Sequence, residues 1–421
     1  MERRTFLKIL SSAGIVSLVS PTFAMEVCKN KVSKSSSALL ESAFRNPPFS
    51  SGVYTWWHWM NGNITKDGIT RDLEAMKANG IAGYQLFEAG SGIPIGPVES
   101  LSDEWVDLIL HTLKESERLG LEFAMHNCPG WSSSGGPWIT PDKAMQIITW
   151  SETKITGGKQ VRIQLPTPKH MFDYYIDTYC LAIPANMKVI PRLSILELSN
   201  RLDKDGVLTW DVPTGEWLIM RFGQTAKDQK NKSAPSKSTG LDCDKFSTEA
   251  LDYHLNCMFK RLMPTMEKIA KHSKIGLLID SYETGDQDWT SDMPAYFEQS
   301  HGYELYPFLP VLANKIVESE ESTKRFLFDF RRVRADMFAE RYYGHFQKRC
   351  KEKGIITYTE PYGGNMMEEL QVAQQLDINM GEFWCGQTVL WANYKYNRTV
   401  KQVASIAHTL GGKSLHVHSP C

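Results

Sequence analysis

The sequence predicts an α/β protein built on a (β/α)8-type TIM barrel, with a β-sandwich-like segment inserted into it. Short apolar or aromatic runs alternate with helical periodicity in residues 48–149, and the same alternation returns in residues 241–421. Residues 150–240 differ, because strand-like runs there are separated by Gly and Pro turns with little helical periodicity. In residues 48–149 and 241–421, acidic residues follow several of the strand-like runs. A βα barrel carries its catalytic groups at the carboxyl ends of its strands.

The amino terminus has the features of a targeting segment. Residues 1–24 resemble a twin-arginine signal peptide, with an arginine pair at Arg3-Arg4, an apolar stretch from Ile9 to Val19 and a small-residue cleavage site at Ala24. The stretch is too short to span a membrane, and no other run is long and apolar enough. We therefore expect an exported, periplasmic protein without a membrane span in the mature chain, and a flexible leader over residues 25–47.

Charge and cysteine content exclude several classes of protein. The formal net charge of the 421 residues is −1 and the isoelectric point is about 6.8, so no nucleic acid or other polyelectrolyte partner is expected. Eight cysteines are dispersed without a CxxC pair, which disfavours a zinc ribbon or a redox site. The 12 Trp and 16 Tyr can form a surface on which sugars stack, although an aromatic core is the commoner explanation. The oligomeric state is left open.

The first part of the barrel, residues 48–149, contains three strand-like runs. Between them, apolar side chains three or four residues apart indicate helices, and glycines end these helices. The expected elements are a strand over 53–59, a helix from the Thr65 cap to Gly80, a strand over 81–87, a helix over 102–119 and a strand over 121–126.

The inserted segment, residues 150–240, contains four strand-like runs. They cover Gln160–Leu165, Tyr174–Ile183, Gly206–Trp210 and Glu216–Arg221. The Lys/Ser/Pro-rich residues 227–238 then predict a flexible return loop or part of a lid.

The second part of the barrel, residues 241–421, has a nearly unbroken apolar run at Ile275–Ile279, which is typical of a parallel strand buried on both faces. The other expected elements are helices over 247–271, 318–353 and 398–410, and strands over 355–360, 376–384 and 413–418. This gives about seven strands where a closed barrel needs eight, so the sequence leaves closure of the barrel open.

Three glutamates follow separate strands of the predicted barrel: Glu283, Glu360 and Glu382. Paired carboxyl groups on a barrel rim are what cleavage of a glycosidic bond requires, because one protonates the leaving oxygen while the other activates water or attacks. Other polar and aromatic residues at this edge are candidates for contacting a sugar. They are His58, Trp59, Asn61, Glu88, His126, Asn127, Trp131, Asp280, Tyr362 and Trp384.

Each candidate also has a structural explanation. Glu360 could hydrogen-bond the turn at Pro361, and Glu382 could pair with an arginine beneath the site. His126 could be a hydrogen-bonded core histidine, and His58, among three tryptophans, is equally a packed aromatic residue. Only the convergence of several acids at one edge favours catalysis over these explanations.

Metal binding has weak support from the residues themselves. His416 and His418 alternate on the last predicted strand, but two histidines without a third ligand are a poor zinc signal. Asp286, Asp288 and Asp292 lack the full calcium-loop pattern, so a solvated acidic loop is favoured there and no metal ligand is assigned.

Several motifs spread along the chain resemble those of one enzyme family. They are Trp57–Ile64, Gly68–Met76, His126–Trp131, Gly135–Trp138, Ile279–Glu283, Glu360–Gly363 and Met380–Trp384. Over about residues 45–415 the chain resembles the bacterial α-L-rhamnosidases of glycoside hydrolase family 106. The resemblance implies a βα barrel with appended β-domains, calcium as a cofactor, an inverting mechanism, and rhamnose-containing plant polysaccharides such as pectin as substrates.

The resemblance also implies roles for individual residues. Glu283 matches the candidate general acid and Glu382 a second active-site glutamate, while Glu360 also fits a rim carboxylate. Family members continue past the turn at Gly412-Lys413 to a further glutamate, expected to be the general base, and Ser419 stands near its place. We therefore expect a truncated chain, and the alternative to an active glycosidase is an inactive carbohydrate-binding remnant that lacks the general base.

Overall fold

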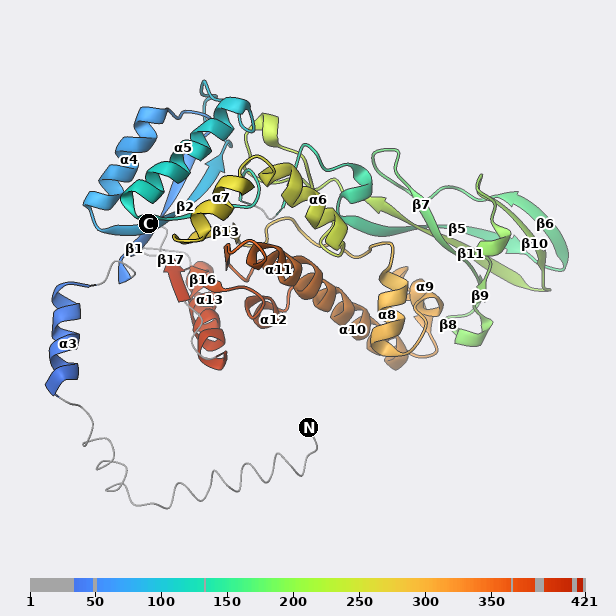
Figure 1. The fold of residues 1–421 in the computed structure, drawn as a ribbon. Coiled ribbons are helices and arrows are strands. Elements are labelled where there is room, and N and C mark those ends of the chain that lie inside the picture. The colour runs from blue at the N-terminus through green and yellow to red at the C-terminus, as the bar shows by residue number, and fades with distance from the viewer. Residues whose placement is uncertain are drawn as a thin grey trace, which may run out of the picture.

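The computed structural model describes residues 34–47, 51–131, 134–364, 366–382, 390–410 and 415–418. Its centre is a seven-stranded sheet in the order β1-β2-β3-β13-β15-β16-β17, in which every pair of neighbours is parallel (Figure 1). The strands are β1 (Val53–Met60), β2 (Ile81–Ala89), β3 (Glu122–His126), β13 (Ile275–Ile279), β15 (Ile356–Thr359), β16 (Ile378–Glu382) and β17 (Leu415–His418). The expected mixed α/β fold with a parallel sheet is therefore confirmed.

The sheet curves into half of a barrel. Among the described residues, β1 and β17 each pair with one strand only, so they form its two edges and closure of the barrel stays a prediction. Residues 275–279 of β13 are all buried, as their apolar run predicted. One buried residue from each of five strands forms a small cluster, comprising Phe87, Ala124, Leu278, Tyr358 and Met380.

Helices cover the other face of the sheet. Helix α4 packs on β2, α5 on β3, α7 on β13, α11 on β15 and α13 on β16. Their bounds are α4 (Lys66–Ala78), α5 (Asp103–Leu119), α6 (Thr248–Phe259), α7 (Met263–Ala270), α10 (Glu320–Met337), α11 (His345–Lys351) and α13 (Leu390–Thr409). The helix expected over 247–271 is thus two helices, and Pro264 lies at the start of the second, where a missing N–H costs least.

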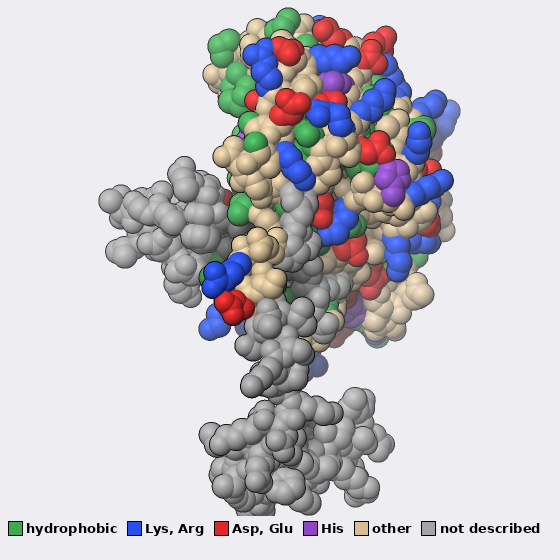
Figure 2. Space-filling model, turned by 60° about the vertical axis from the view of Figure 1, so that its left-hand side comes forward, with side chains coloured by type: hydrophobic (Ala, Val, Ile, Leu, Met, Phe, Trp, Pro, Cys, Tyr) green, Lys and Arg blue, Asp and Glu red, His purple; other side chains and the backbone are tan. Residues whose placement is uncertain are grey.

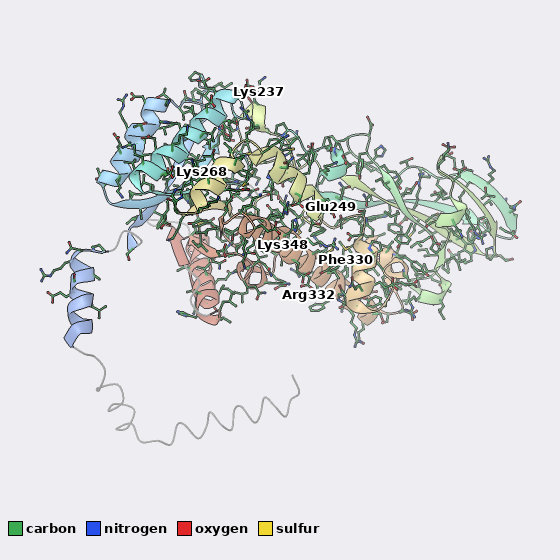
Figure 3. All side chains as sticks on the ribbon, in the orientation of Figure 1. Lys237, Glu249, Lys268, Phe330, Arg332 and Lys348 are labelled. Atoms are coloured by element: carbon green, nitrogen blue, oxygen red, sulfur yellow. The ribbon has the colours of Figure 1, made fainter. Side chains whose placement is uncertain are left out.

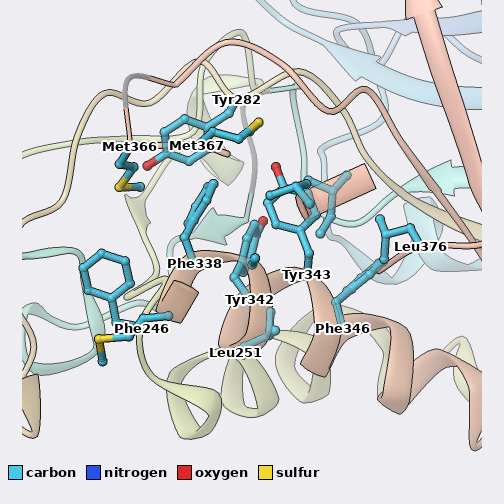
Figure 4. Packing of buried hydrophobic residues seen from close by; sticks show 14 of the residues in the cluster. Phe246, Leu251, Tyr282, Phe338, Tyr342, Tyr343, Phe346, Met366, Met367 and Leu376 are labelled. Atoms are coloured by element: carbon cyan, nitrogen blue, oxygen red, sulfur yellow. The ribbon is translucent and has the colours of Figure 1, made fainter. Parts of the chain in front are cut away.

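The helix expected over 318–353 continues from α10 to α11 through a π-helical turn, Phe338–Gly344. This turn presents Phe338, Tyr342 and Tyr343 to the core, where they pack edge-to-face or stacked on one another and on Tyr282 (Figure 4). Tyr282 comes from the loop after β13, so this aromatic core holds the loop that follows the central strand.

The inserted segment is β-rich, as predicted, and extends away from the parallel sheet (Figure 1). Its strands form a four-stranded antiparallel sheet in the order β5-β11-β7-β9 and a two-stranded ribbon of β10 and β6. The two share a buried core around Trp210 and Ile219, whereas a complete sandwich stays a prediction. The strands are β5 (Gln146–Thr156), β6 (Lys159–Gln164), β7 (Ile176–Pro184), β9 (Leu196–Glu197), β10 (Val207–Val212) and β11 (Glu216–Ala226).

Several shorter elements complete the described chain. They are α3 (Lys34–Arg45), inside the expected leader, β4 (Gly135–Gly136), β8 (Val189–Ile190), β12 (Leu241–Asp242), α8 (Met293–His301), α9 (Leu309–Leu312), β14 (Ile316–Val317) and α12 (Glu369–Ala373). None of the helices in the described part of the chain is long and apolar enough to cross a membrane. Residues 1–24, where the signal peptide is expected, lie outside the described residues. Figure 2 shows acidic and basic side chains interspersed on the described part of the visible face.

Candidate active site

A cavity of about 600 Å³ lies at the carboxyl ends of the parallel strands. Strands β1 and β2, and the segments at or after the ends of β3, β13, β15 and β16, all contribute side chains to it, as expected for a parallel sheet whose strand ends meet at one edge. The described residues that line it are Trp56, His58, Phe87, Trp131, Lys232, Asp280, Ser281, Tyr282, Glu283, Gly285, Glu360, Tyr362, Gly363 and Glu382.

One tyrosine connects two buried acids of this cavity, and a third buried acid lines the cavity beside them. The Tyr362 hydroxyl oxygen lies 2.5 Å from Glu360 Oε2 and 2.7 Å from Glu382 Oε2. A phenol has a single proton to donate, so one of the two carboxyl groups must donate its own proton to the phenol oxygen. Asp280 lines the same cavity and lies close enough to Glu360 for the charges of the two carboxyl groups to interact. The cluster is therefore built to share protons.

Burial keeps part of this cluster protonated. It raises the pKa of Glu360 to about 8, and the negative charge of Glu382 acts in the same direction. Burial, and then the charges of Glu360 and Glu283, raise the pKa of Asp280 well above its usual range. Asp280 Oδ1 and Glu360 Oε1 are buried without a hydrogen-bond partner among the described residues. Both atoms are therefore shielded from solvent inside the cluster.

Glu283 differs from the other three acids because its side chain is exposed. It follows β13 by four residues, and the Ser281 hydroxyl donates a hydrogen bond of 3.1 Å to its Oε1. The loop that carries it is fixed at Tyr282, whose N–H donates to the Tyr362 carbonyl oxygen at 2.8 Å. The cavity therefore presents one open carboxyl group beside three buried ones.

Aromatic side chains form one wall of the cavity. The His58 ring stacks on Phe87 with centroids 5.5 Å apart, and Trp56 meets both rings. The Trp56 indole N–H donates to Gln85 Oε1 at 3.0 Å, which fixes the ring in place. Burial lowers the pKa of His58, so its imidazole is neutral at neutral pH. A neutral aromatic wall of this kind suits the apolar face of a sugar ring.

Of the candidate site residues that the structure describes, seven line the cavity and five do not. His58, Trp131, Asp280, Glu283, Glu360, Tyr362 and Glu382 line it. Of the five others, Trp59 is buried in the main core, 1% exposed. Asn61 donates from Nδ2 to the Ile93 carbonyl oxygen at 2.7 Å, which fixes the loop after β1.

Glu88, His126 and Asn127 lie beneath the cavity and support its loops. Glu88 accepts a hydrogen bond from Ser100, and burial raises its pKa to about 7. His126 Nε2 accepts the Asp280 N–H at 3.4 Å, and its Nδ1 lies 3.0 Å from the Cys128 carbonyl oxygen. Burial lowers the pKa of His126 to about 4, so the histidine stays neutral while it holds the backbone of Asp280.

Asn127 likewise serves the backbone, donating from Nδ2 to the Leu278 carbonyl oxygen at 2.9 Å. Trp384 and the expected place of the general base at Ser419 lie outside the described residues. The His416 and His418 backbones belong to β17, and their side chains lie outside the description.

Seven residues of the cavity lining were not among the sequence candidates: Trp56, Phe87, Lys232, Ser281, Tyr282, Gly285 and Gly363. Trp56 lies two residues before His58 on β1, so strand alternation could have found it. Phe87 directly precedes the named Glu88, so it lies on the opposite face of β2. Lys232 carries no such signal, because it comes from the return loop of the inserted segment. That loop was expected to be flexible or part of a lid.

The described residues show no cluster of metal-binding side chains. Among them, no group of three or more His, Cys, Asp or Glu side chains is arranged to hold a metal ion. Asp288 Oδ1 instead accepts the Ile148 N–H at 2.8 Å, and Asp292 pairs with Arg341 at 2.8 Å. Calcium therefore stays a prediction from the resemblance, without ligands in the described part of the chain.

Three comparisons relate this chain to proteins that are named as glycoside hydrolases. A family model for alpha-L-rhamnosidase, glycoside hydrolase family 106, matches residues 45–177 and 169–419. A protein of Formosa agariphila named putative beta-glucuronidase is 41% identical over 407 residues, covering 89% of this chain and 34% of the relative. The chain thus spans about a third of the length of that curated relative. A rhamnosidase structure from Novosphingobium sp. PP1Y has a TM-score of 0.79 at 22% identity, covering 90% of this chain and 56% of that one, and shares the fold.

Proposed function

Because the chain belongs to glycoside hydrolase family 106, we propose that it acts as an α-L-rhamnosidase on plant polysaccharides such as pectin, by an inverting mechanism. The observation that carries the proposal is the meeting of four carboxyl groups in one cavity from three strand ends, Asp280, Glu283, Glu360 and Glu382. An aromatic wall faces these acids. Carboxyl groups of unlike environment beside a stacking surface are the groups that glycoside hydrolysis uses.

We assign the general acid to Glu283. A general acid must reach the glycosidic oxygen, and Glu283 is the exposed member of the four acids. The buried acids Asp280, Glu360 and Glu382 line the same cavity, where we place them in contact with hydroxyl groups of the sugar. Pectin also contains uronic acids. The name of the relative, putative beta-glucuronidase, refers to a sugar of the same class.

A second candidate function is carbohydrate binding without turnover. It rests on Ser419, which stands where the resemblance expects the general base. Without a base, the attacking water of an inverting reaction lacks its activating group, while the described cavity can still hold a sugar. The two functions differ in whether rhamnose is released.

Leaving-group dependence tests the acid assignment. The chain is expected to release rhamnose from aryl α-L-rhamnosides, and Glu283→Gln should lower the rate by about 10²- to 10⁴-fold for a poor leaving group. A nitrophenol leaving group needs little protonation, so the same variant should lose far less activity on it. Glu360→Gln keeps the shape of the protonated carboxyl group and serves as the matched control.

Three outcomes would change these conclusions. A leaving-group-dependent loss in Glu360→Gln but not in Glu283→Gln would move the acid to Glu360. An equal loss on both leaving groups would remove Glu283 from the role of proton donor. Absence of turnover together with retained rhamnose binding would favour the carbohydrate-binding function.

A further inference from the structure

A lysine enters the candidate active site from the inserted segment. Lys232 lies in the loop that returns from β11 to the barrel, and it is the one lysine or arginine among the described residues of the cavity lining. Its side chain is exposed, whereas Asp280, Glu360 and Glu382 are buried. The cavity therefore has a cation at its open side and proton-sharing acids at its floor.

The backbone around Lys232 is held by two loops of the barrel. The Trp131 N–H donates to the Lys232 carbonyl oxygen at 3.3 Å, and the Gly90 N–H donates to the Ser233 carbonyl oxygen at 2.7 Å. The buried Asn231 side chain donates to the Pro129 carbonyl oxygen at 2.9 Å. This loop is thus fixed against the segments after β2 and β3.

The approach of the two loops is close enough to require glycine. Gly130 has a φ of +80°, and a Cβ there would lie 2.0 Å from the Lys232 carbonyl oxygen. The position of Lys232 is consequently a built feature of the fold, and its neighbour across the hydrogen bond, Trp131, lines the same cavity. Trp131 and Lys232 therefore reach the same cavity from two loops that a backbone hydrogen bond joins.

We propose that Trp131 and Lys232 form a subsite for an acidic sugar, with the ring on the indole and the carboxylate on the ammonium group. The proposal rests on the proposed function, because it places this sugar next to the one that is cleaved. The ionised carboxyl groups of the cavity would repel an anionic substrate, and a cation offsets that repulsion at one place only. Lys232 thereby selects substrates whose neighbouring residue is a uronic acid and orients that carboxylate away from the acids.

The test compares two disaccharides that differ in charge alone. One is L-rhamnose α-linked to a uronic acid, and the other is its carboxyl-reduced counterpart. Calorimetric titration in the Glu283→Gln background prevents hydrolysis during binding. We expect the acidic disaccharide to bind about fivefold to tenfold more tightly, as for one charge-assisted hydrogen bond, with the preference shrinking at high ionic strength.

Substitutions in the same loop assign the preference to a residue. Lys232→Ala should abolish it and Lys232→Arg should retain it, because the charge is kept. Lys237→Ala is the matched control, since Lys237 is an exposed lysine of the same loop that does not line the cavity (Figure 3). Trp131→Ala should weaken binding of both disaccharides, because stacking does not depend on charge.

The outcomes separate this subsite from the proposed function. Equal affinity for the two disaccharides, or a preference that survives Lys232→Ala, would overturn the subsite even if the chain releases rhamnose. A preference lost in Lys232→Ala and kept in Lys237→Ala would support it, even if the chain with Glu283 intact releases no rhamnose.

Discussion

Replacing Tyr362 with phenylalanine removes the hydroxyl group that lies between Glu360 and Glu382. The side chains of Tyr362 and Glu360 are 5% and 2% exposed, so water replaces the lost hydrogen bonds poorly. We expect the cost in unfolding free energy to depend on pH, because the hydroxyl group matters most when a neighbouring carboxyl group is ionised.

The sign follows from proton binding. Burial raises the pKa of Glu360 to about 8, so between its ordinary value and 8 the folded chain binds more protons than the unfolded chain. Stability from this group is therefore greatest at low pH and falls as the pH rises through that window. Removing the Tyr362 hydroxyl group takes a hydrogen-bond donor away from the ionised Glu360 carboxylate. The unfolding free energy should therefore fall more steeply as the pH rises.

The magnitude comes from the hydrogen bonds that are lost. A hydrogen bond to a charged group contributes about 1.5–3 kcal/mol, so Tyr362→Phe should cost about 2–4 kcal/mol near pH 8. Near pH 5 the Glu360 carboxyl group is protonated and can itself donate a hydrogen bond, so the cost should fall to about 1 kcal/mol. Urea denaturation followed by tryptophan fluorescence at the two pH values measures the difference.

Tyr343→Phe is the matched control. Tyr343 is fully buried in the aromatic core around Tyr282 (Figure 4), and its hydroxyl group has no hydrogen-bond partner among the described residues. Its removal should change stability by less than about 0.5 kcal/mol at either pH. An equal cost of Tyr362→Phe at both pH values, or a cost of the same size for Tyr343→Phe, would refute the reasoning.

Three further perturbations test the supporting residues. Burial raises the pKa of Glu88 to about 7, so the folded state binds more protons than the unfolded state below that pH, and the melting temperature should fall as the pH rises from about 5 to about 7. Glu88→Gln should make this fall in melting temperature smaller. An unchanged dependence of the melting temperature on pH would contradict the prediction. Burial lowers the pKa of His126 to about 4, so the unfolded state binds the extra proton below about pH 6.5, and the His126 NMR signals should show no titration between about pH 5 and pH 8. Gly130→Ala should destabilise the chain by about 2 kcal/mol or more, because the new Cβ would meet the Lys232 carbonyl oxygen. Gly92 has a φ of +72° and no atom near the position of a Cβ, so Gly92→Ala should cost only about 1 kcal/mol. Thermal melts measure both costs, and equal costs would argue against the contact.

Much of the fold could be predicted because it is written in local periodicity. The apolar run Ile275–Ile279 is a fully buried strand, and the six other strands of the parallel sheet fall where their runs lie. Strand β5 has 11 residues but was not predicted. Its first residues belong to the segment that the sequence assigned to the barrel, and its remaining residues belong to the inserted segment. Local pattern identifies an element but does not show which sheet it joins.

The site prediction was right or wrong according to the direction in which each strand side chain points. On β1, His58 faces the cavity and the next residue, Trp59, faces the main core. On β2, Phe87 lines the cavity, while Glu88 turns toward Ser100 near the start of α5. Alternate strand residues point to opposite faces, so an error of one residue in direction exchanges a cavity residue for a supporting one.

The sequence by itself determined the family, the order of strands and helices, and the acids that follow the central strands, because these depend on neighbours within a few residues. Only the tertiary structure decided that Tyr362 bridges Glu360 and Glu382, that His126 holds the backbone of Asp280, and that Lys232 reaches the cavity from the inserted segment. These contacts join parts of the chain that are up to about 150 residues apart, and their geometry follows from strand register and loop closure, which no local pattern specifies.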